Sequence, residues 1–206
     1  MQLSFFTDSD VVNIARSLVG NFLFSRVGGV LAGGMITETE AYCGNRDLAM
    51  QKHLLRRPSS VATLEKEGGI AYIYTVYGYH SMFNIVTNKP GYADSVLIRG
   101  IRPTTGIDTM QARRGRKNSL NDLCSGPAKL TQALALTPAL NGEPVFNNNT
   151  VWIESNADFS SGESIISAPR IGIDYAKEDR KEDKSEAQGT RDDTTLPWRF
   201  TLTQCG

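Results

Sequence analysis

The sequence predicts an α+β fold: one domain over residues 1–206, in which a mainly antiparallel, curved β core is flanked by helices. The length of 206 residues is ordinary for one domain, and no internal repeat or linker divides the chain. Strand-like segments follow one another in pairs joined by glycine turns, which is typical of antiparallel hairpins. Helix-like segments interrupt them without a regular strand–helix–strand alternation, which argues against a doubly wound parallel sheet.

The chain begins with an expected helix and an expected hairpin. Apolar residues at helical spacing predict a helix over 11–18, after the capping candidates Asp8 and Ser9. Strands are expected over 22–26 and 30–42, and the two glycines between these ranges predict a tight turn.

A second hairpin is expected in the centre of the chain. Its strands cover 71–77 and 81–87 and turn at Gly78, and a further strand covers 95–101. These three segments continue the antiparallel pattern of the first hairpin.

Two helices are expected after this strand. Thr104 or Thr105 is a capping candidate for a short helix that runs toward Met110. A second helix begins at Pro127, because proline is favoured in the first helical turn.

The last third contains the strands expected over 151–154, 170–174 and 198–202. Between the last two, residues 176–195 are almost wholly charged, polar or glycine. Such a segment buries too little apolar surface to fold alone, so we expect a mobile charged loop there.

The composition excludes several classes of protein. No apolar run approaches the roughly 20 residues that span a bilayer, and the N-terminus lacks the pattern of a signal peptide. Three widely spaced cysteines fit reduced thiols better than a disulfide framework. With two histidines and no paired CxxC motif, we expect no protein-held metal and no cofactor. A cytoplasmic protein is the simplest interpretation, associated with the nucleoid if its source is bacterial.

The formal net charge is zero, but the charges are unevenly distributed. Residues 1–135 hold 15 Lys/Arg against 10 Asp/Glu, and residues 136–206 hold 7 against 12. The basic residues concentrate in one group: Arg99, Arg102, Arg113, Arg114, Arg116 and Lys117. This group is either a solvated loop or a surface for phosphates, so charge permits nucleic-acid binding without establishing it.

The strand expected over 30–42 carries two carboxylates. Side chains alternate in a strand, which places Ile36, Glu38, Glu40 and Tyr42 on one face. This face is either the solvated side of an edge strand or a site that combines a carboxylate with an aromatic ring.

Tyrosines cluster in the second hairpin. Tyr72 and Tyr74 share a strand face, and Tyr77 lies at the turn into Gly78. Cross-strand aromatic packing explains such residues without any function. A tyrosine held at a hairpin tip could also act as a rigid wedge in a base stack.

Arg99 stands inside an otherwise apolar strand. Arginine is rarely buried unless it is paired, so Arg99 either meets a structural carboxylate or orients a group in a pocket. Glu40 is an available partner, and such a pair would keep its carboxylate ionised at neutral pH.

Several motifs together resemble the alkyladenine, or 3-methyladenine, DNA glycosylase family. They occur in the family's order and cover the chain from about residue 10 to 203. The matching segments are 39–42, 72–78 with Asn84, 96–99, 123–134, 170–173 and 197–200.

The resemblance implies a catalytic pair in this chain. Glu40 matches the general base that activates water for attack on the sugar's anomeric carbon, and Arg99 matches the residue that helps to hold that water. No nucleophilic lysine is required, so cleavage of the DNA strand is not implied.

The resemblance also implies a pocket for a base that has left the stack. Tyr42 and Tyr74 match the rings on either side of the flipped base, Asn84 lines the same pocket, and Tyr77 fills the vacated space in the duplex. An aromatic cage of this kind suits positively charged alkylated purines.

Contacts to the DNA backbone are expected from two further places. Ser125 and Gly126 open a helix whose N–H groups could bind a phosphate, and Arg113 and Arg114 belong to the basic group.

The chain departs from the family pattern at one pocket position. Where the family has a histidine that touches the bound base, the spacing places Gln51, and His53 follows two residues later. Glutamine both donates and accepts hydrogen bonds, whereas histidine needs a chosen tautomer for either role. The resemblance therefore leaves open which bases are recognised.

The function expected from all these features is that of a monofunctional N-glycosylase in base excision repair. It would act as a monomer on double-stranded DNA containing damaged purines: 3-methyladenine, with 7-methylguanine and hypoxanthine as further candidates. The alternative is a non-catalytic relative that binds damaged DNA through an altered pocket. A non-catalytic RNA-binding relative is a third reading, but it leaves the pairing of Glu40 with Arg99 unexplained.

Overall fold

The computed structural model describes residues 1–115, 118–159, 164–177 and 191–203. Its centre is a curled antiparallel sheet with the strand order β3-β4-β5-β2-β1-β6, to which β8 and β7 are added beside β2. The strands are β1 (Phe22–Val27), β2 (Val30–Tyr42), β3 (Ala71–Val76), β4 (His80–Thr87), β5 (Asp94–Thr105), β6 (Val151–Glu154), β7 (Ile165–Ala168) and β8 (Arg199–Leu202).

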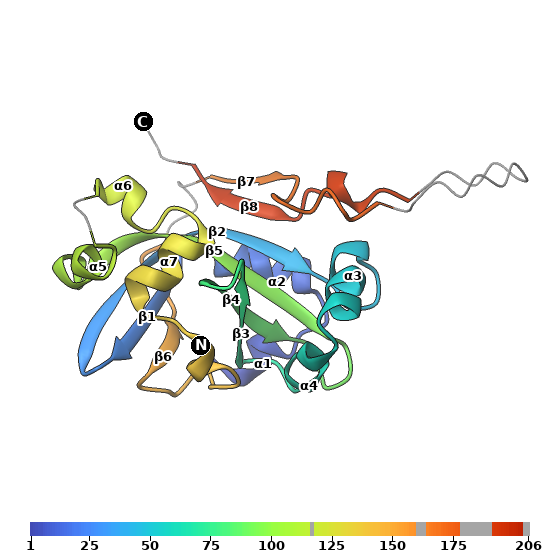
Figure 1. Ribbon diagram of the computed structural model, residues 1–206, viewed down its shortest axis with the longest axis horizontal. Coiled ribbons are helices and arrows are strands. Elements are labelled where there is room, and N and C mark those ends of the chain that lie inside the picture. The colour runs from blue at the N-terminus through green and yellow to red at the C-terminus, as the bar shows by residue number, and fades with distance from the viewer. Residues whose placement is uncertain (116–117, 160–163, 178–190, 204–206) are drawn as a thin grey trace, which may run out of the picture.

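The long strand β2 changes partners along its length, and this produces the curl. Its first half, through Met35, pairs with β1 on one side, whereas Glu38 to Glu40 pair with β8 on that side. Its other side pairs with β5 almost throughout. The predicted α+β fold with a curved, mainly antiparallel core is confirmed (Figure 1).

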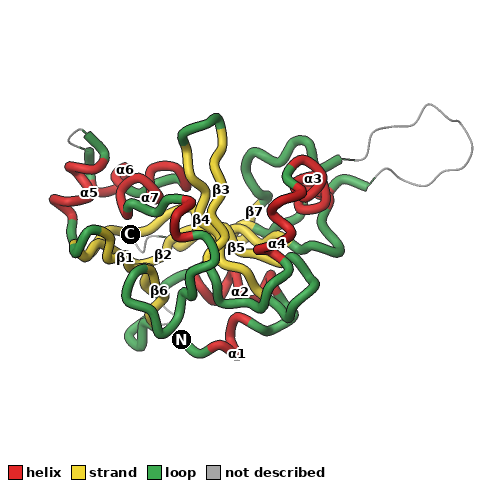
Figure 2. The backbone as a smooth tube through the Cα atoms, turned by 60° about the horizontal axis from the view of Figure 1, so that its bottom comes forward, coloured by secondary structure: helices red, strands yellow, loops and turns green. Residues whose placement is uncertain are grey.

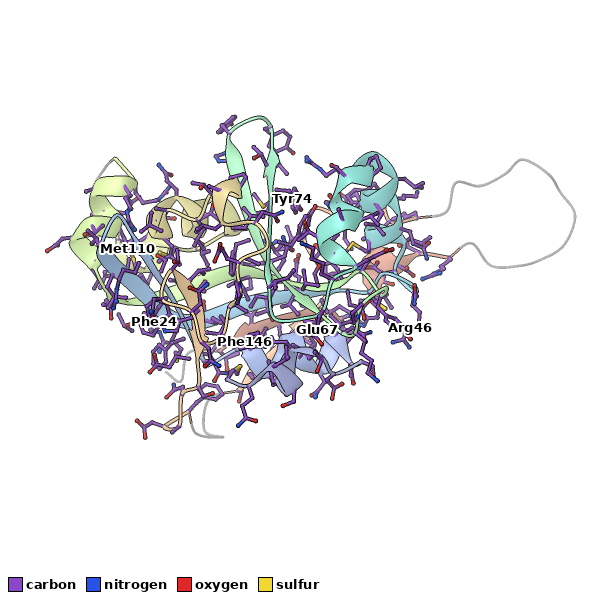
Figure 3. The ribbon with its side chains drawn as sticks, turned by 90° about the horizontal axis from the view of Figure 1, so that it is seen from below. Phe24, Arg46, Glu67, Tyr74, Met110 and Phe146 are labelled. Atoms are coloured by element: carbon purple, nitrogen blue, oxygen red, sulfur yellow. The ribbon has the colours of Figure 1, made fainter. Side chains whose placement is uncertain are left out.

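Helices cover both faces of the sheet. In the described residues they are α1 (Leu3–Phe6), α2 (Val11–Leu18), α3 (Leu48–Arg56), α4 (Val61–Leu64), α5 (Ile107–Arg113), α6 (Leu120–Leu123) and α7 (Pro127–Leu134), with short 3₁₀ helices at Pro58–Ser60, Pro138–Leu140 and Asp193–Thr195. Figures 2 and 3 show α2 under the sheet, and the β3–β4 hairpin, α3 and α7 above it. The β3–β4 hairpin therefore stands between α7 and α3 on one side of the sheet (Figure 2).

Local signals account for most of these elements. The helix predicted over 11–18 is α2; its apolar face is buried, and the Asp10 side chain caps it by accepting from the Asn13 N–H. Both predicted hairpins form with close to the expected bounds. Pro127 begins α7 as expected, with Gly126 as its N-cap.

Three expectations about elements are wrong. Helix α2 is capped by Asp10 rather than by Asp8 or Ser9. Residues 170–174 form bends and turns rather than a strand, because the Ile171 N–H donates to a side chain, Glu40, and Gly172 has a φ of +76°. Thr104 and Thr105 extend β5 instead of capping α5. That helix is preceded by Gly106, whose φ is +72°.

The charged segment 176–195 is also more structured at its ends than expected. Ala176 is fully buried, Lys177 bridges to Asp192, and the buried Asp193 carboxylate accepts from the Leu48 N–H at 2.8 Å. The central part of the predicted mobile loop, 178–190, lies outside the described residues. Within the described part of the chain, no helix is long and apolar enough to cross a membrane.

Candidate active site

Two irregularities in the β2–β5 pairing shape the candidate site. Ile36 pairs with Ile101, Glu38 with Gly100, and Thr39 with Ile98. Thr37 and Arg99 are therefore extra residues without a partner in the regular ladder, which makes each of them a β-bulge. Bulges change the direction of neighbouring side chains and are common next to active sites. The predicted alternation does not run through Ile36, which is fully buried in the main hydrophobic cluster.

The Glu40 carboxylate is completely buried and held by three donors. Its Oε1 accepts from the Ile171 N–H at 2.7 Å, and its Oε2 accepts from the Tyr42 hydroxyl at 2.8 Å. Arg99 Nη1 lies 3.3 Å from the same Oε2. Burial raises the pKa of Glu40 above its ordinary value, although Arg99 and the two hydrogen bonds act in the opposite direction.

A second carboxylate completes a network of ion pairs. Arg99 Nε donates to Glu38 Oε1 at 3.0 Å, and Arg199 Nη1 donates to the same atom at 3.1 Å. Two guanidinium groups and two carboxylates thus balance each other at this edge of the sheet. The sequence-based pairing of Arg99 with Glu40 is present, and Glu38 and Arg199 are additional members.

Tyr42 forms one wall of the site, and a buried arginine packs against its ring. The Arg170 guanidinium carbon lies 4.8 Å from the centre of the Tyr42 ring. Arg170 is in turn paired with the buried Asp47, with Nη2 to Oδ1 at 2.8 Å. Asp47 also caps α3 by accepting from the Ala49 N–H, so one carboxylate positions both the wall and the helix.

Tyr74, Tyr72 and His53 form the opposite wall. The two tyrosine rings are stacked at 5.3 Å, and His53 approaches the Tyr74 ring edge-on at 4.8 Å. His53 Nε2 and the Tyr72 hydroxyl are 2.8 Å apart, and that hydroxyl is 2.5 Å from the Ser60 hydroxyl. Figure 3 shows Tyr74 in the space between the β3–β4 hairpin and α3.

His53 is neutral at physiological pH in this setting. Burial lowers the pKa of its imidazole to about 4, and Arg57 and Arg56 contribute in the same direction. It therefore offers one donor and one acceptor rather than a positive charge.

Between the two walls lies a small inner cavity of about 30 Å³, so the walls must move apart before a base can enter. Asn84 lines it and is held by its side-chain N–H₂ group, which donates to the Tyr72 carbonyl at 3.3 Å. The full lining is Tyr42, Met50, His53, Tyr72, Tyr74, Asn84, Ser95 and Tyr175. The cavity adjoins an outer cleft of about 830 Å³ to which Tyr42, His53, Tyr74 and Tyr175 also contribute.

The expectation that Gln51 lies in this pocket is wrong. Its side chain turns to the Asn45 carbonyl at 3.3 Å and lines neither the cavity nor the cleft. Along α3 the cavity-lining residues are Met50 and His53, three residues apart and hence on one helical face. A histidine, His53, thus lines the cavity two positions after Gln51.

The hairpin tip presents Tyr77 to solvent. Its side chain is 87% exposed, and its backbone has a φ of +51°, followed by Gly78 at +78°. Two consecutive positive φ values define a tight hairpin turn, and a bulky residue in this region is strained. The ring is therefore held outward at the rim of the cleft, of which Tyr77 is a lining residue.

The residues expected to contact the DNA backbone differ in availability. Ser125 is exposed, and Gly126 precedes α7. Arg113 instead donates to the Ala133 and Val27 carbonyls, and Arg114 donates to Gln132 Oε1 at 2.6 Å. These contacts give the two arginines a structural role and do not support the predicted one. Arg116 and Lys117 lie outside the described residues.

Sequence reasoning missed several contributors to the site. Tyr175 lines the cavity, and Ile171 supplies a main-chain donor to Glu40, yet both come from a segment about 130 positions after β2. His53 had a local signal, the helical spacing after the capping residue Asp47, and Ile171 lies in the segment 170–173 that resembles the family. Among the described residues, no group of three or more His, Cys, Asp or Glu side chains is arranged to hold a metal ion.

Comparison with known proteins gives a consistent result. The family model for methylpurine-DNA glycosylase matches residues 4–205. A relative from Chlamydia abortus is 40% identical over 200 residues, covering 97% of this chain and 96% of its own. Relatives from Natranaerobius thermophilus and Clostridium perfringens are each 35% identical and cover 84% and 85% of this chain, and 87% and 89% of their own lengths. All three carry the name "Putative 3-methyladenine DNA glycosylase".

Proposed function

The chain belongs to the methylpurine-DNA glycosylase family and is a DNA glycosylase, and we propose that it takes damaged purines out of the helix into the cavity between Tyr42 and Tyr74. The proposed bases are 3-methyladenine, 7-methylguanine and hypoxanthine in double-stranded DNA. Hydrolysis of the N-glycosidic bond then releases the base and leaves the strand intact.

In the proposed mechanism, Glu40 accepts a proton from the water that attacks the anomeric carbon. The observation that carries this proposal is the double role of Tyr42, which lines the cavity and donates to Glu40 at 2.8 Å. A base against the Tyr42 ring would therefore place its sugar near the carboxylate. Glu40 has no exposed surface, so the proposal implies that Arg99 or Ile171 shifts slightly when substrate and water enter.

The proposal predicts an elevated acid limb in the pH profile. A general base acts only when ionised, and burial raises the pKa of Glu40, so kcat/KM should begin to fall at a higher pH than an exposed glutamate would give. Arg99 is the strongest influence that lowers this pKa. Arg99→Gln should therefore move the limb to higher pH.

The matched control is Arg199→Gln, because the Arg199 guanidinium is paired with Glu38 and not with the Glu40 carboxylate. Excision rates measured between pH 4.5 and 9 on one oligonucleotide would give the acid limb of the native protein and of both variants. An unchanged limb in Arg99→Gln would contradict the assignment of that limb to Glu40.

Tyr77 is proposed to fill the space that the flipped base leaves. Tyr77→Gly should raise the melting temperature slightly or leave it unchanged, because glycine relieves the strain of the positive φ. Loss of ring–base stacking, about 1–3 kcal/mol, should weaken binding to lesion DNA by roughly 5- to 100-fold.

Tyr92→Ala provides the control, since Tyr92 is also exposed but lines neither the cavity nor the cleft. Fluorescence anisotropy with a lesion-containing duplex measures the binding. If Tyr77→Gly bound the duplex as tightly as the native protein, the proposed wedge would be wrong.

Three further expectations stay predictions: a monomer, a cytoplasmic location with association to the nucleoid, and DNA contacts by Ser125 and Gly126. The exposure of Ser125 at the start of α7 supports the last of these.

A further inference from the structure

The wall of the inner cavity is neutral. It contains four tyrosines together with Met50, His53, Asn84 and Ser95, and no carboxylate or guanidinium among the lining residues. The low pKa of His53 keeps its ring uncharged, and burial raises the pKa of Tyr74. The charge that a bound base experiences therefore comes from groups behind this wall.

Three of the four tyrosines are already in contact with an arginine. The guanidinium carbon of Arg170 lies 4.8 Å from the Tyr42 ring centre, that of Arg57 lies 4.9 Å from Tyr74, and that of Arg56 lies 4.4 Å from Tyr175. All three distances fall within the range of cation–π attraction. Each ring's negative face thus has one cation beside it before any substrate arrives.

Only one of these three cations is neutralised nearby. Arg170 is paired with the buried Asp47. Arg57 donates to the Thr75 carbonyl at 2.7 Å, and the described residues provide no ion pair for Arg57 or Arg56. The carboxylates Glu38 and Glu40 are balanced by Arg99 and Arg199. Within the described part of the chain, two positive charges at the mouth of the cavity thus have no carboxylate partner, and Arg57 is the less exposed of the two.

We propose that Arg57, assisted by Arg56, sets the charge selectivity of the site by disfavouring cationic damaged bases relative to neutral ones. A permanent cation on the Tyr74 ring weakens its attraction for a second cation and repels it through a partly desolvated cavity. A neutral base such as hypoxanthine loses nothing from this arrangement, whereas 7-methylguanine, which is cationic in DNA, does. This inference rests on the proposed excision of both kinds of base.

The test compares single-turnover excision from two duplexes that differ only in the lesion, one with 7-methylguanine and one with hypoxanthine. The ratio of the two rates removes general effects on folding and DNA binding. Arg57→Gln should raise the ratio of 7-methylguanine to hypoxanthine excision by about two- to fivefold, which corresponds to the loss of one partly exposed cation–π contact. Arg57→Lys keeps the charge and should keep the native ratio, and Arg56→Gln should have a smaller effect.

Arg26→Gln is the matched control, because Arg26 also lies over an aromatic ring, Trp152 at 5.7 Å, away from both cavities. An independent readout is the His53 titration followed by NMR. The pKa of His53 should rise in Arg57→Gln, since Arg57 contributes to its lowering.

A rise in the ratio that Arg57→Lys restores supports the inference. Equal losses on both duplexes with a weaker salt dependence of binding would show that Arg57 only contacts phosphates, and an unchanged ratio in an active enzyme would likewise overturn the inference. If the native protein released neither base, the inference would fail together with the proposed range of bases, and release of 3-methyladenine from methylated DNA would test the rest of the proposed function separately.

Discussion

Glu40→Gln should reduce base release by at least about 10²- to 10⁴-fold, the typical contribution of a general base. Glutamine has nearly the same shape but cannot accept the proton from water. Its amide oxygen can still accept either the Ile171 N–H or the Tyr42 hydroxyl, so the site should keep its geometry. Binding to a lesion-containing duplex should therefore stay close to native. Free bases released from methylated DNA, and heat-labile abasic sites, provide the measurement.

The same variant should fold at least as stably as the native protein. Folding raises the pKa of Glu40. The folded state therefore favours the protonated form, and above this raised pKa the ionised carboxylate costs stability. A permanently neutral glutamine removes that cost. Loss of activity with an equal or higher melting temperature would distinguish a catalytic carboxylate from a structural one.

Glu154→Gln is the control for a carboxylate at an exposed strand position, and it should leave both activity and melting temperature unchanged. Native rates of 3-methyladenine release by Glu40→Gln would contradict the proposed mechanism. They would leave the family assignment unaffected.

The elements predicted correctly are those with strong local signals. The period of α2, the glycine turns of the two hairpins and Pro127 at the start of α7 depend on neighbours only a few residues away. The strand expected over 170–174 had suitable residues but does not form, since the Ile171 N–H donates to Glu40 and the chain turns at Gly172. Strand formation there depends on distant partners that a local pattern cannot supply.

The residues of the candidate site fall into two similar groups, those positioned by strand pairing, which were predicted correctly, and those positioned by α3, which were not. Glu40, Tyr42, Tyr74, Asn84 and Arg99 come together as expected because adjacent strands carry them. The spacing of the family pattern predicted that Gln51 would lie in the pocket. The helical face of α3, set by its cap at Asp47, instead presents His53. A spacing argument along a helix thus needs the phase of that helix, which the sequence alone did not fix.

Arg170→Met should be the most destabilising of the substitutions considered. Arg170 is buried, donates to the Ala41 carbonyl at 2.9 Å and to both oxygens of Asp47, and lies near the rings of Tyr42 and Trp198. Its removal leaves the Asp47 carboxylate buried without a counter-ion, which typically costs about 3–5 kcal/mol. In a domain of this size the melting temperature should fall by roughly 10 °C. Lys129→Gln, which breaks the partly exposed pair with Asp122, should cost less than about 1 kcal/mol.

A double-mutant cycle with Asp47→Asn separates the charge effect from lost packing. Asparagine keeps the cap on α3, but in the single variant it leaves Arg170 as a lone buried cation. The double variant contains no unpaired charge, so it should be clearly more stable than the sum of the two single losses implies. Strict additivity, measured by urea unfolding, would show that the pair acts through shape alone. Coupling would mean that one ion pair holds the Tyr42 wall, the Ile171 donor to Glu40 and the helix of His53 together, and that stability and activity are lost together when it breaks.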